Sequence, residues 1–344
     1  MTDQARTRPG LLPKQRWELT DAKKVRAQNA GRRFVMNLLR YALVICLSYL
    51  ILAPILINIT TAFTYPRDLG LSSSLWIPAR ISMENWHVAL LSLNYKVSLP
   101  YTIVQTALIA LLQTFCAMLA AYSFARLKFP GRGLLFAFAV FTIIVPPQTF
   151  MLPQYVYFRN FDILGIFKAI TGKPLNLLGS PLSLVLINGL GQGLKGGLFI
   201  YIFRQVYRSL PKSLEEAAYV DGAGFIRTFF GIVVPSSTSG LLTVLVLSFV
   251  WNWNDAYYIR LFDSSNSQNL MLAYTRAVGS VDQAIARIAT QVPAHYAFLQ
   301  KNPMYEAAIG KTAALLVFLP LVIMYLVVQR RFVQGVERSG LAGD

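Results

Sequence analysis

Charged, histidine and cysteine side chains are all scarce in this chain, and their scarcity excludes several kinds of chemistry. Of the 344 residues, 14% are charged, two are cysteine and two are histidine. Cys46 and Cys116 lie inside apolar runs, where a thiol behaves as a small apolar group, so we expect neither a disulfide nor a metal site. His87 and His295 stand alone in polar segments, so we assign them no role and expect no cofactor.

Carboxylates are nearly absent from the apolar runs, with Asp255 at the edge of one of them. A carrier driven by an ion or proton gradient is expected to hold carboxylates at membrane depth. An enzyme working inside the membrane would need a nucleophile–base pair, a carboxylate dyad or a metal cluster there, and none is visible. The sequence therefore weighs against bond chemistry, and an ion-coupled secondary carrier for a small polar solute is kept as an alternative function.

Apolar residues, by contrast, make up 55% of the chain, more than a soluble domain of this size could cover with polar groups. Six runs reach the roughly 20 residues that a membrane-spanning helix needs. They lie at residues 37–63, 99–124, 134–158, 181–205, 236–260 and 307–329. We therefore predict an all-α, polytopic integral membrane protein with six transmembrane helices.

The positive charges are distributed unevenly between the loops. The net charge is +17. About twenty Lys and Arg lie in the N-terminal tail, the 126–132 loop, the 204–227 loop and the C-terminal tail, against about ten in the other three loops. The positive-inside rule then places both termini in the cytoplasm. Because topology accounts for the charge, we expect no nucleic-acid partner.

The runs divide the chain into segments. We predict a basic cytoplasmic tail at 1–36, the first transmembrane helix and an external loop at 37–98, a membrane core at 99–330, and a cytoplasmic tail at 331–344. Within the tail, residues 15–33 form either a basic helix on the inner membrane surface or a solvated segment that sets the topology. The longest external loop is expected at about 261–306.

A charged loop at 211–235 separates two apolar runs and is predicted to begin with a short helix. Ser213 followed by Glu216 is typical of a capping box, in which the hydroxyl caps the helix and the glutamate reaches back to the serine amide. Gly222 after Asp221 is the expected stop, because glycine adopts the left-handed conformation without steric cost.

A second short amphipathic helix is predicted after Gly222. It is expected to place Phe225, Phe229 and Ile232 on its apolar side, with Pro235 at the entry to the next apolar run. Two short helices hinged at a glycine form a rigid knob, and a rigid knob can transmit a push. The residues alone therefore indicate a docking element on the cytoplasmic face.

The same loop reads E-A-A-x-x-D-G-A from Glu216, with Ile232 and Pro235 downstream. This string resembles the cytoplasmic coupling loop of binding-protein-dependent ABC importer permeases. Five further stretches resemble the carbohydrate branch of that family, in its maltose-type second permease. They are Leu-Lys-Phe-Pro-Gly at 127–131, Pro-Pro-Gln at 146–148, Leu-Pro at 152–153, Trp-Asn-Trp-Asn-Asp at 251–255 and Gln-Arg-Arg-Phe-Val-Gln-Gly at 329–335. The resemblance covers residues 99–340.

The resemblance implies an ABC type I importer permease fold and a role for each residue of the loop motif. Glu216, Ala217, Ala218, Asp221 and Gly222 would sit in the cleft of a separate cytoplasmic ATPase, so the chain itself would not be an enzyme. The implied partners are a second permease subunit in a heterodimer, two ATP-binding subunits, an extracytoplasmic solute-binding protein and membrane lipid. The implied cargo is a sugar or oligosaccharide, moved by alternating access across the plasma (inner) membrane of a bacterium or archaeon.

The chain departs from the family at 167–180 and 261–306, which are longer than the resemblance leads us to expect.

Two glycine patterns imitate nucleotide-binding motifs. Residues 310–312 end like a phosphate-binding loop, but Tyr305 occupies the first glycine position, and residues 191–196 spell a dinucleotide motif without a flanking strand. Close helix packing in lipid is the interpretation we prefer for the glycines at i+4 spacing, Gly189, Gly193 and Gly197.

Three residues are candidates for the translocation path: Lys195, Trp251 and Asn254. Lys195 lies nine residues before Arg204, about 13 Å deeper along a continuous helix. An ammonium there should face the path or an acidic partner, unless a break in the fourth run leaves it near the outer interface. Trp251, Trp253 and Asn254 either stack on and hydrogen-bond a sugar or anchor the helix end at the interface.

Overall fold

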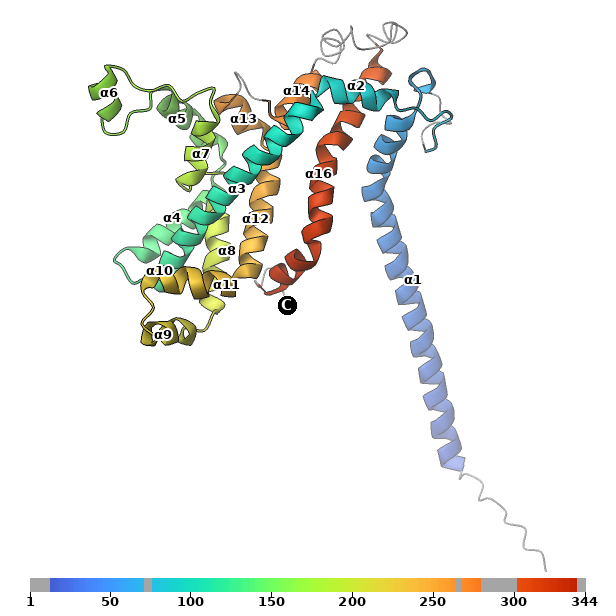
Figure 1. Cartoon of the computed structure of the whole chain (residues 1–344). Coiled ribbons are helices and arrows are strands. Elements are labelled where there is room, and N and C mark those ends of the chain that lie inside the picture. Colours follow the sequence, from blue (N-terminus) through green and yellow to red (C-terminus); the bar gives the residue numbers. More distant parts are fainter. Residues whose placement is uncertain (1–12, 71–75, 264–267, 280–301, 339–344) are drawn as a thin grey trace, which may run out of the picture. The chain divides into compact units, whose positions relative to one another are not determined.

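The computed structural model describes residues 13–70, 76–263, 268–279 and 302–338, with backbone only for 13–31 and 331–338. Within these ranges the regular elements are helices, and strand pairing is limited to two isolated β-bridges (Figure 1). The all-α prediction is therefore confirmed for the described residues. Backbone contacts divide the chain into a unit Met1–Thr60 and a unit Thr61–Asp344.

The first unit consists of most of α1, Pro13–Phe63, a helix of 51 residues and so about 77 Å long. Its segment Arg32–Phe63 is long and apolar enough to cross a membrane. Most of its apolar side chains are exposed, as Leu50 at 71% illustrates. Residues 15–33 are helical, and whether this helix lies on the membrane surface or is solvated stays a prediction.

The second unit contains the remaining α-helices of the described residues. They are α2 (Glu84–Ser92), α3 (Tyr95–Arg126), α4 (Arg132–Ile144), α5 (Gln148–Arg159), α6 (Ile166–Thr171), α7 (Pro181–Gly189), α8 (Gly196–Ser209), α9 (Ser213–Val220), α10 (Phe225–Thr228), α11 (Val234–Ser236), α12 (Thr238–Trp253), α13 (Ala256–Phe262), α14 (Leu270–Gly279) and α16 (Pro303–Arg338). Figure 1 shows α9, α10 and α11 at one end of this bundle and α2, α13 and α14 at the other.

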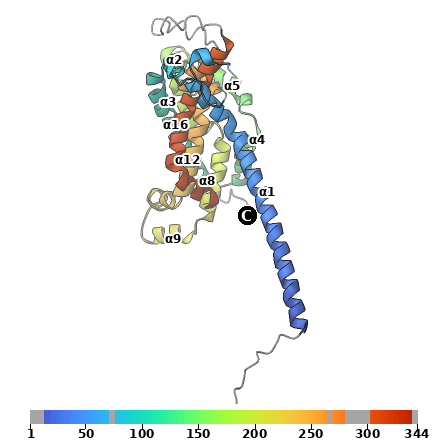
Figure 2. The same ribbon diagram turned by 90° about the vertical axis from the view of Figure 1, so that its right-hand side faces the viewer.

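Helix α3 is the centre of the second unit and packs against α7, α8 and α12, while α12 also packs against α16 (Figure 2). Its buried face carries polar side chains, among them Thr102, Gln105 and Gln113. In a membrane bundle such groups bond across helices, since hydrocarbon offers them no partner. The Gln105 amide accordingly donates to the Asp263 carboxylate at 2.9 Å.

Continuous spans account for only part of the predicted six. Among the described residues, three helices could cross a membrane, or up to five if each of two bent pairs is one span. The predicted 134–158 span bends by 105° between α4 and α5, where Pro146 and Pro147 lack the amide protons that would continue the helix. The second bend, of 79°, lies between Phe225–Ser236 and Thr238–Trp253. The count of six spans therefore stays a prediction.

The sequence leaves two forms open for the run at 181–205, a continuous span and a broken one, and the structure shows the broken one. α7 ends at Gly189 and α8 begins at Gly196. Between them, Gly191 has φ +76° and Lys195 has φ +60°. Left-handed backbone ends a right-handed helix, so these two residues explain the break.

The break also corrects the predicted glycine stripe, because Gly189, Gly193 and Gly197 lie on two helices and the turn between them. Gly193 and Gly197 nevertheless lie where neighbouring atoms come so close that a side chain would not fit. A Cβ on Gly197 would meet the Ala139 carbonyl oxygen of α4, and one on Gly193 would meet the Asn188 side chain. Around Gly189 there is open space.

Candidate functional site

Helix α9 ends as the sequence predicts. Gly222 has φ +78°, and its amide donates to the Tyr219 carbonyl at 3.1 Å. The Ala223 amide donates to the Ala218 carbonyl at 2.9 Å. This pair of bonds is the Schellman arrangement that follows a left-handed residue at a helix end. The hinge after Asp221 is therefore a defined turn.

The predicted capping box at the start of α9 is wrong. The residue at the cap is Lys212, with helical backbone angles and no side-chain cap bond. The amides of Glu215 and Glu216 donate to the Lys212 carbonyl at 3.0 and 3.1 Å. Ser213 lies inside the first turn, whereas a capping hydroxyl needs an extended residue just outside the helix.

The adjacent Glu215 is the carboxylate that fixes α9 to the bundle. It lies 2.7 Å from Arg126 Nε at the end of α3, and their side chains are 11% and 9% exposed. The Tyr122 hydroxyl donates to Glu215 at 2.9 Å, and Arg126 also donates to the Leu210 carbonyl at 2.8 Å. We call Glu215, Arg126 and Tyr122 the α3–α9 clamp.

The sequence analysis missed this clamp. A signal was present, because Glu215 and Ala218 are three residues apart and therefore share one face of α9. Both are buried, and the residues between them are exposed. An acidic residue on the inward face of a short helix indicates a buried basic partner. The sequence could not name Arg126 as that partner.

The five predicted coupling residues lie together on α9 and its hinge. Glu216, Ala217, Asp221 and Gly222 are exposed. Ala218 is only 3% exposed and packs towards the body of the protein. Four of the five are thus open to a partner, and the fifth contributes to holding the helix.

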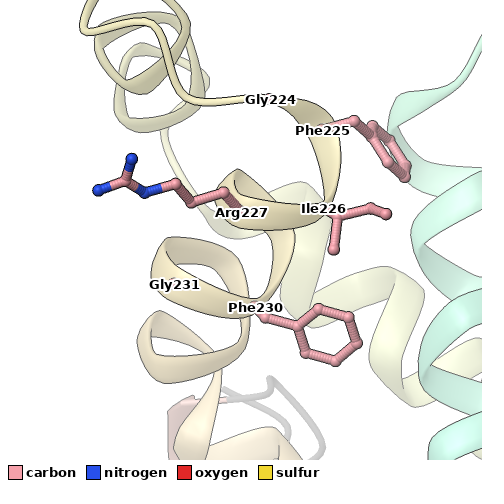
Figure 3. Close-up of a pocket in the computed structure, with 6 residues that line it drawn as sticks. All are labelled: Gly224, Phe225, Ile226, Arg227, Phe230 and Gly231. Carbon is pink, nitrogen blue, oxygen red and sulfur yellow. The ribbon is translucent and has the colours of Figure 1, made fainter.

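The turn after Gly222 presents an apolar surface beside these residues. Phe225, Ile226 and Phe230 are 47%, 71% and 49% exposed. Figure 3 shows these three side chains on one side of the turn and Arg227 directed to the other. An open hollow is formed here by Gly224, Phe225, Ile226, Arg227, Phe230 and Gly231. Exposed apolar groups with a polar rim are typical of a docking surface.

The second predicted helix is α10, which continues through a π-helical turn of five residues into α11. Phe229 is buried and its ring centroid lies 4.7 Å from that of Tyr122. The Phe225 ring also contacts Tyr122, at 5.7 Å, and Ile232 is half-buried. The predicted apolar side is confirmed for Phe229, and α12 begins soon after Pro235, as predicted.

The break between α7 and α8 is held by a polar side chain of α3. Gln113 Nε2 donates to the Leu194 carbonyl at 2.5 Å. Gln113 Oε1 accepts bonds from the Ser248 hydroxyl at 2.6 Å and the Asn252 amide at 2.9 Å. One buried glutamine thus connects the break to α3 and α12.

Two of the three predicted path residues lie together. Lys195 Nζ lies 5.0 Å from the centroid of the half-exposed Trp251 ring. Among the described residues no ion pair joins Lys195 to a carboxylate. Asn254 is exposed and donates to the Val250 carbonyl at 3.0 Å. Trp253 is 1% exposed and packs in the core, so neither predicted role, sugar contact or interface anchor, fits it.

The imitation phosphate loop at 310–312 lies within α16, where the Thr312 hydroxyl donates to the Ala308 carbonyl at 2.7 Å. A helical segment cannot cradle phosphate as a loop does. In the described part of the chain, no group of three His, Cys, Asp or Glu residues could hold a metal ion.

Comparison with known families gives a match that covers most of the second unit, Thr61–Asp344. The family described as "Binding-protein-dependent transport system inner membrane component" matches residues 113–338, more than half of the chain.

Curated relatives share 27–33% identity. A probable ABC transporter permease protein of Pyrococcus horikoshii is 33% identical over 48% of this chain and 51% of its own. The sn-glycerol-3-phosphate transport system permease protein UgpE of Yersinia enterocolitica is 29% identical over 65% of this chain and 66% of its own. The melibiose/raffinose/stachyose import permease protein MelC of Bacillus subtilis is 27% identical over 88% and 94%. The match to the first two relatives thus spans about half to two thirds of their lengths.

Among the solved structures that match this chain is one with a similar fold. It is a bacterial ABC transporter involved in the import of the acidic polysaccharide alginate, with a TM-score of 0.64 and 17% identity. The match covers 87% of this chain and 96% of that one. At this identity the likeness establishes the fold.

Proposed function

Because this chain belongs to the family of binding-protein-dependent transport system inner membrane components, we propose that it is the permease subunit of an ATP-driven importer. As a member of this family it is a multi-pass membrane protein. In the proposed mechanism a separate subunit hydrolyses ATP and pushes on the loop at 211–235. The ion-coupled carrier is not favoured by these relatives.

The main support for the proposal is the attachment of α9 to α3. The α3–α9 clamp joins the loop to α3, the central helix of the core, through a buried ion pair. On the opposite face, Glu216, Ala217 and Asp221 are open to a partner. A displacement of α9 would therefore move α3, which packs against α7, α8 and α12.

The proposed cargo is a sugar or oligosaccharide. The names of MelC and UgpE, a raffinose-type permease and a glycerol phosphate permease, support a polyol-like solute. Lys195 and Trp251, with Asn254 nearby in sequence, are the proposed path residues, since an aromatic face can stack on a sugar and an ammonium can donate to hydroxyls.

The proposed assembly contains a second permease subunit, two ATP-binding subunits and an extracytoplasmic solute-binding protein, in a plasma membrane. In the proposed organisation residues 1–36 and 331–344 are cytoplasmic tails, 37–98 holds the first transmembrane helix with an external loop, and 99–330 is the permease core. The loop at 261–306 is a proposed contact for the binding protein, and part of it lies outside the described residues.

The proposal is tested by the ATPase activity of the co-purified complex in nanodiscs, with and without loaded binding protein. The informative variant is Gly222→Asp. A side chain at Gly222 meets open space, so its cost is the strain of a left-handed backbone, about 1–2 kcal/mol, and not a clash. We expect stimulation in the wild type and its loss in the intact variant complex.

The matched control is Gly133→Asp, on α4 and outside the loop at 211–235. Gly133 also faces open space, but its φ lies outside the left-handed range. We expect this variant to keep most of the stimulation. If Gly222→Asp hydrolyses and transports like the wild type, the loop does not couple the chain to an ATPase.

A further inference from the structure

Three arginines gather where the α3–α4 turn meets α8. Arg204 and Arg208 are four residues apart on α8, so their Cβ atoms lie about 5–6 Å apart on one face. Arg132 is the first residue of α4, and its charge, like that of Arg208, repels the Arg204 guanidinium. No ion pair offsets these charges within the described residues. We call Arg132, Arg204 and Arg208 the arginine cluster.

The central member of the cluster is held in place with a donor unused. The Arg204 guanidinium carbon lies 4.0 Å from the Phe136 ring centroid, and Phe136 in turn packs edge-on against Phe124. Arg204 Nε is buried and finds no acceptor among the described residues. The terminal Nη groups of Arg204 are not enclosed and make no hydrogen bond among the described residues, so they are open to an external acceptor.

The helix that begins at the cluster, α4, exposes mainly apolar side chains. α4 has no buried residue, and its large exposed side chains are Leu134, Leu135, Phe138, Phe141 and Ile144. In a membrane protein such a face is suited to acyl chains. The cluster stands at the N-terminal end of this face, where a membrane-spanning helix meets headgroups.

We propose that the arginine cluster binds the phosphate of an anionic phospholipid, whose acyl chain lies along α4. Phosphate oxygens would accept from the Nη groups of Arg204 and offset the mutual repulsion of the three guanidinium groups. Guanidinium forks match phosphate in a bidentate manner, which a lone ammonium does not. The apolar face of α4 favours a lipid over a soluble phosphate. The site goes beyond the proposed function, because it does not depend on which solute is carried.

The test is native mass spectrometry of the full complex, released from nanodiscs that contain equal amounts of phosphatidylglycerol and phosphatidylcholine. We expect the wild type to retain phosphatidylglycerol preferentially. In the variant Arg204→Gln/Arg208→Gln retention should fall by about fivefold per charge, roughly 25-fold in all. The charge-matched control is Arg159→Gln/Arg260→Gln, on α5 and α13 at the other end of the bundle, and it should retain the lipid (Figure 1).

Further measurements distinguish a bound lipid from a soluble anion and from a subunit contact at the arginine cluster. Inorganic phosphate at millimolar concentration should not displace the lipid, and displacement would assign the cluster to a soluble anion. Equal retention in the cluster variant, or equal loss in the control, would overturn the proposal. Loss of a protein subunit with unchanged lipid retention would assign the cluster to a subunit contact. If the double variant fails to fold, the single variant Arg208→Gln, at an exposed position, gives the same test.

Discussion

Glu215→Gln is the substitution that probes the mounting of α9 most sharply. It leaves the Arg126 guanidinium, 9% exposed, without a countercharge. Removing one member of a buried pair costs about 3–5 kcal/mol, because the remaining charge stays desolvated. Every step of about 1.4 kcal/mol changes an equilibrium constant tenfold. A cost of about 3 kcal/mol should therefore raise the equilibrium constant for detachment of α9 from α3 roughly 100-fold.

Hydrogen exchange of the purified complex measures this opening. The amide of Asp221, which donates to the Ala217 carbonyl at 2.9 Å, should lose protection with the rest of α9. The control for exchange is Ser213→Ala, because Ser213 is exposed, has no part in the clamp and is not one of the five coupling residues. Its α9 amides should exchange as in the wild type.

A double-mutant cycle checks the reasoning behind the magnitude. Arg126→Gln combined with Glu215→Gln removes both charges, so no unpaired buried charge remains. The double variant should therefore open less often than the sum of the two single effects predicts. If Glu215→Gln raises the exchange of α9 by less than threefold, or if the two effects simply add, the clamp does not hold the loop.

Three further outcomes are expected. Gly197→Ala should lower the melting temperature of the complex, because the new Cβ would meet a backbone oxygen of α4 and overpacking costs about 1–3 kcal/mol. Gly189→Ala is the control, and it should leave the melting temperature unchanged because Gly189 faces open space. Gln113→Leu should lower the free energy of unfolding by about 2–4 kcal/mol, measured by chemical unfolding, because it leaves the Ser248 hydroxyl and the Leu194 carbonyl unpaired. A variant as stable as the wild type would contradict this role of Gln113. Lys195→Met should change transport kinetics while the complex still assembles, and unchanged kinetics would remove Lys195 from the path.

The parts of the site that the sequence predicted are those decided by a few neighbouring residues. The stop of α9 followed from Gly222 alone, since a left-handed turn favours glycine wherever it occurs. The cap failed because it depends on where the helix begins to within one residue, and α9 takes Lys212 instead of Ser213 as its cap.

The parts that escaped prediction depend on residues far apart in the chain. Glu215 meets Tyr122 across 93 positions and Gln113 meets Leu194 across 81, separations that no local pattern encodes. The sequence offers the break at 190–195 only as an alternative, because the i+4 spacing of the glycines is equally compatible with one packed helix. Hydropathy predicted apolar runs correctly and could not distinguish a straight span from a broken one.

ATP-driven uptake in proteoliposomes tests the central claim most directly. The complex is reconstituted with its binding protein and a radiolabelled oligosaccharide, and ion gradients are collapsed with ionophores. The account predicts uptake that requires both internal ATP and the loaded binding protein, and that persists without any gradient. Uptake that proceeds without ATP and stops when the gradients collapse would contradict it and establish the ion-coupled carrier instead.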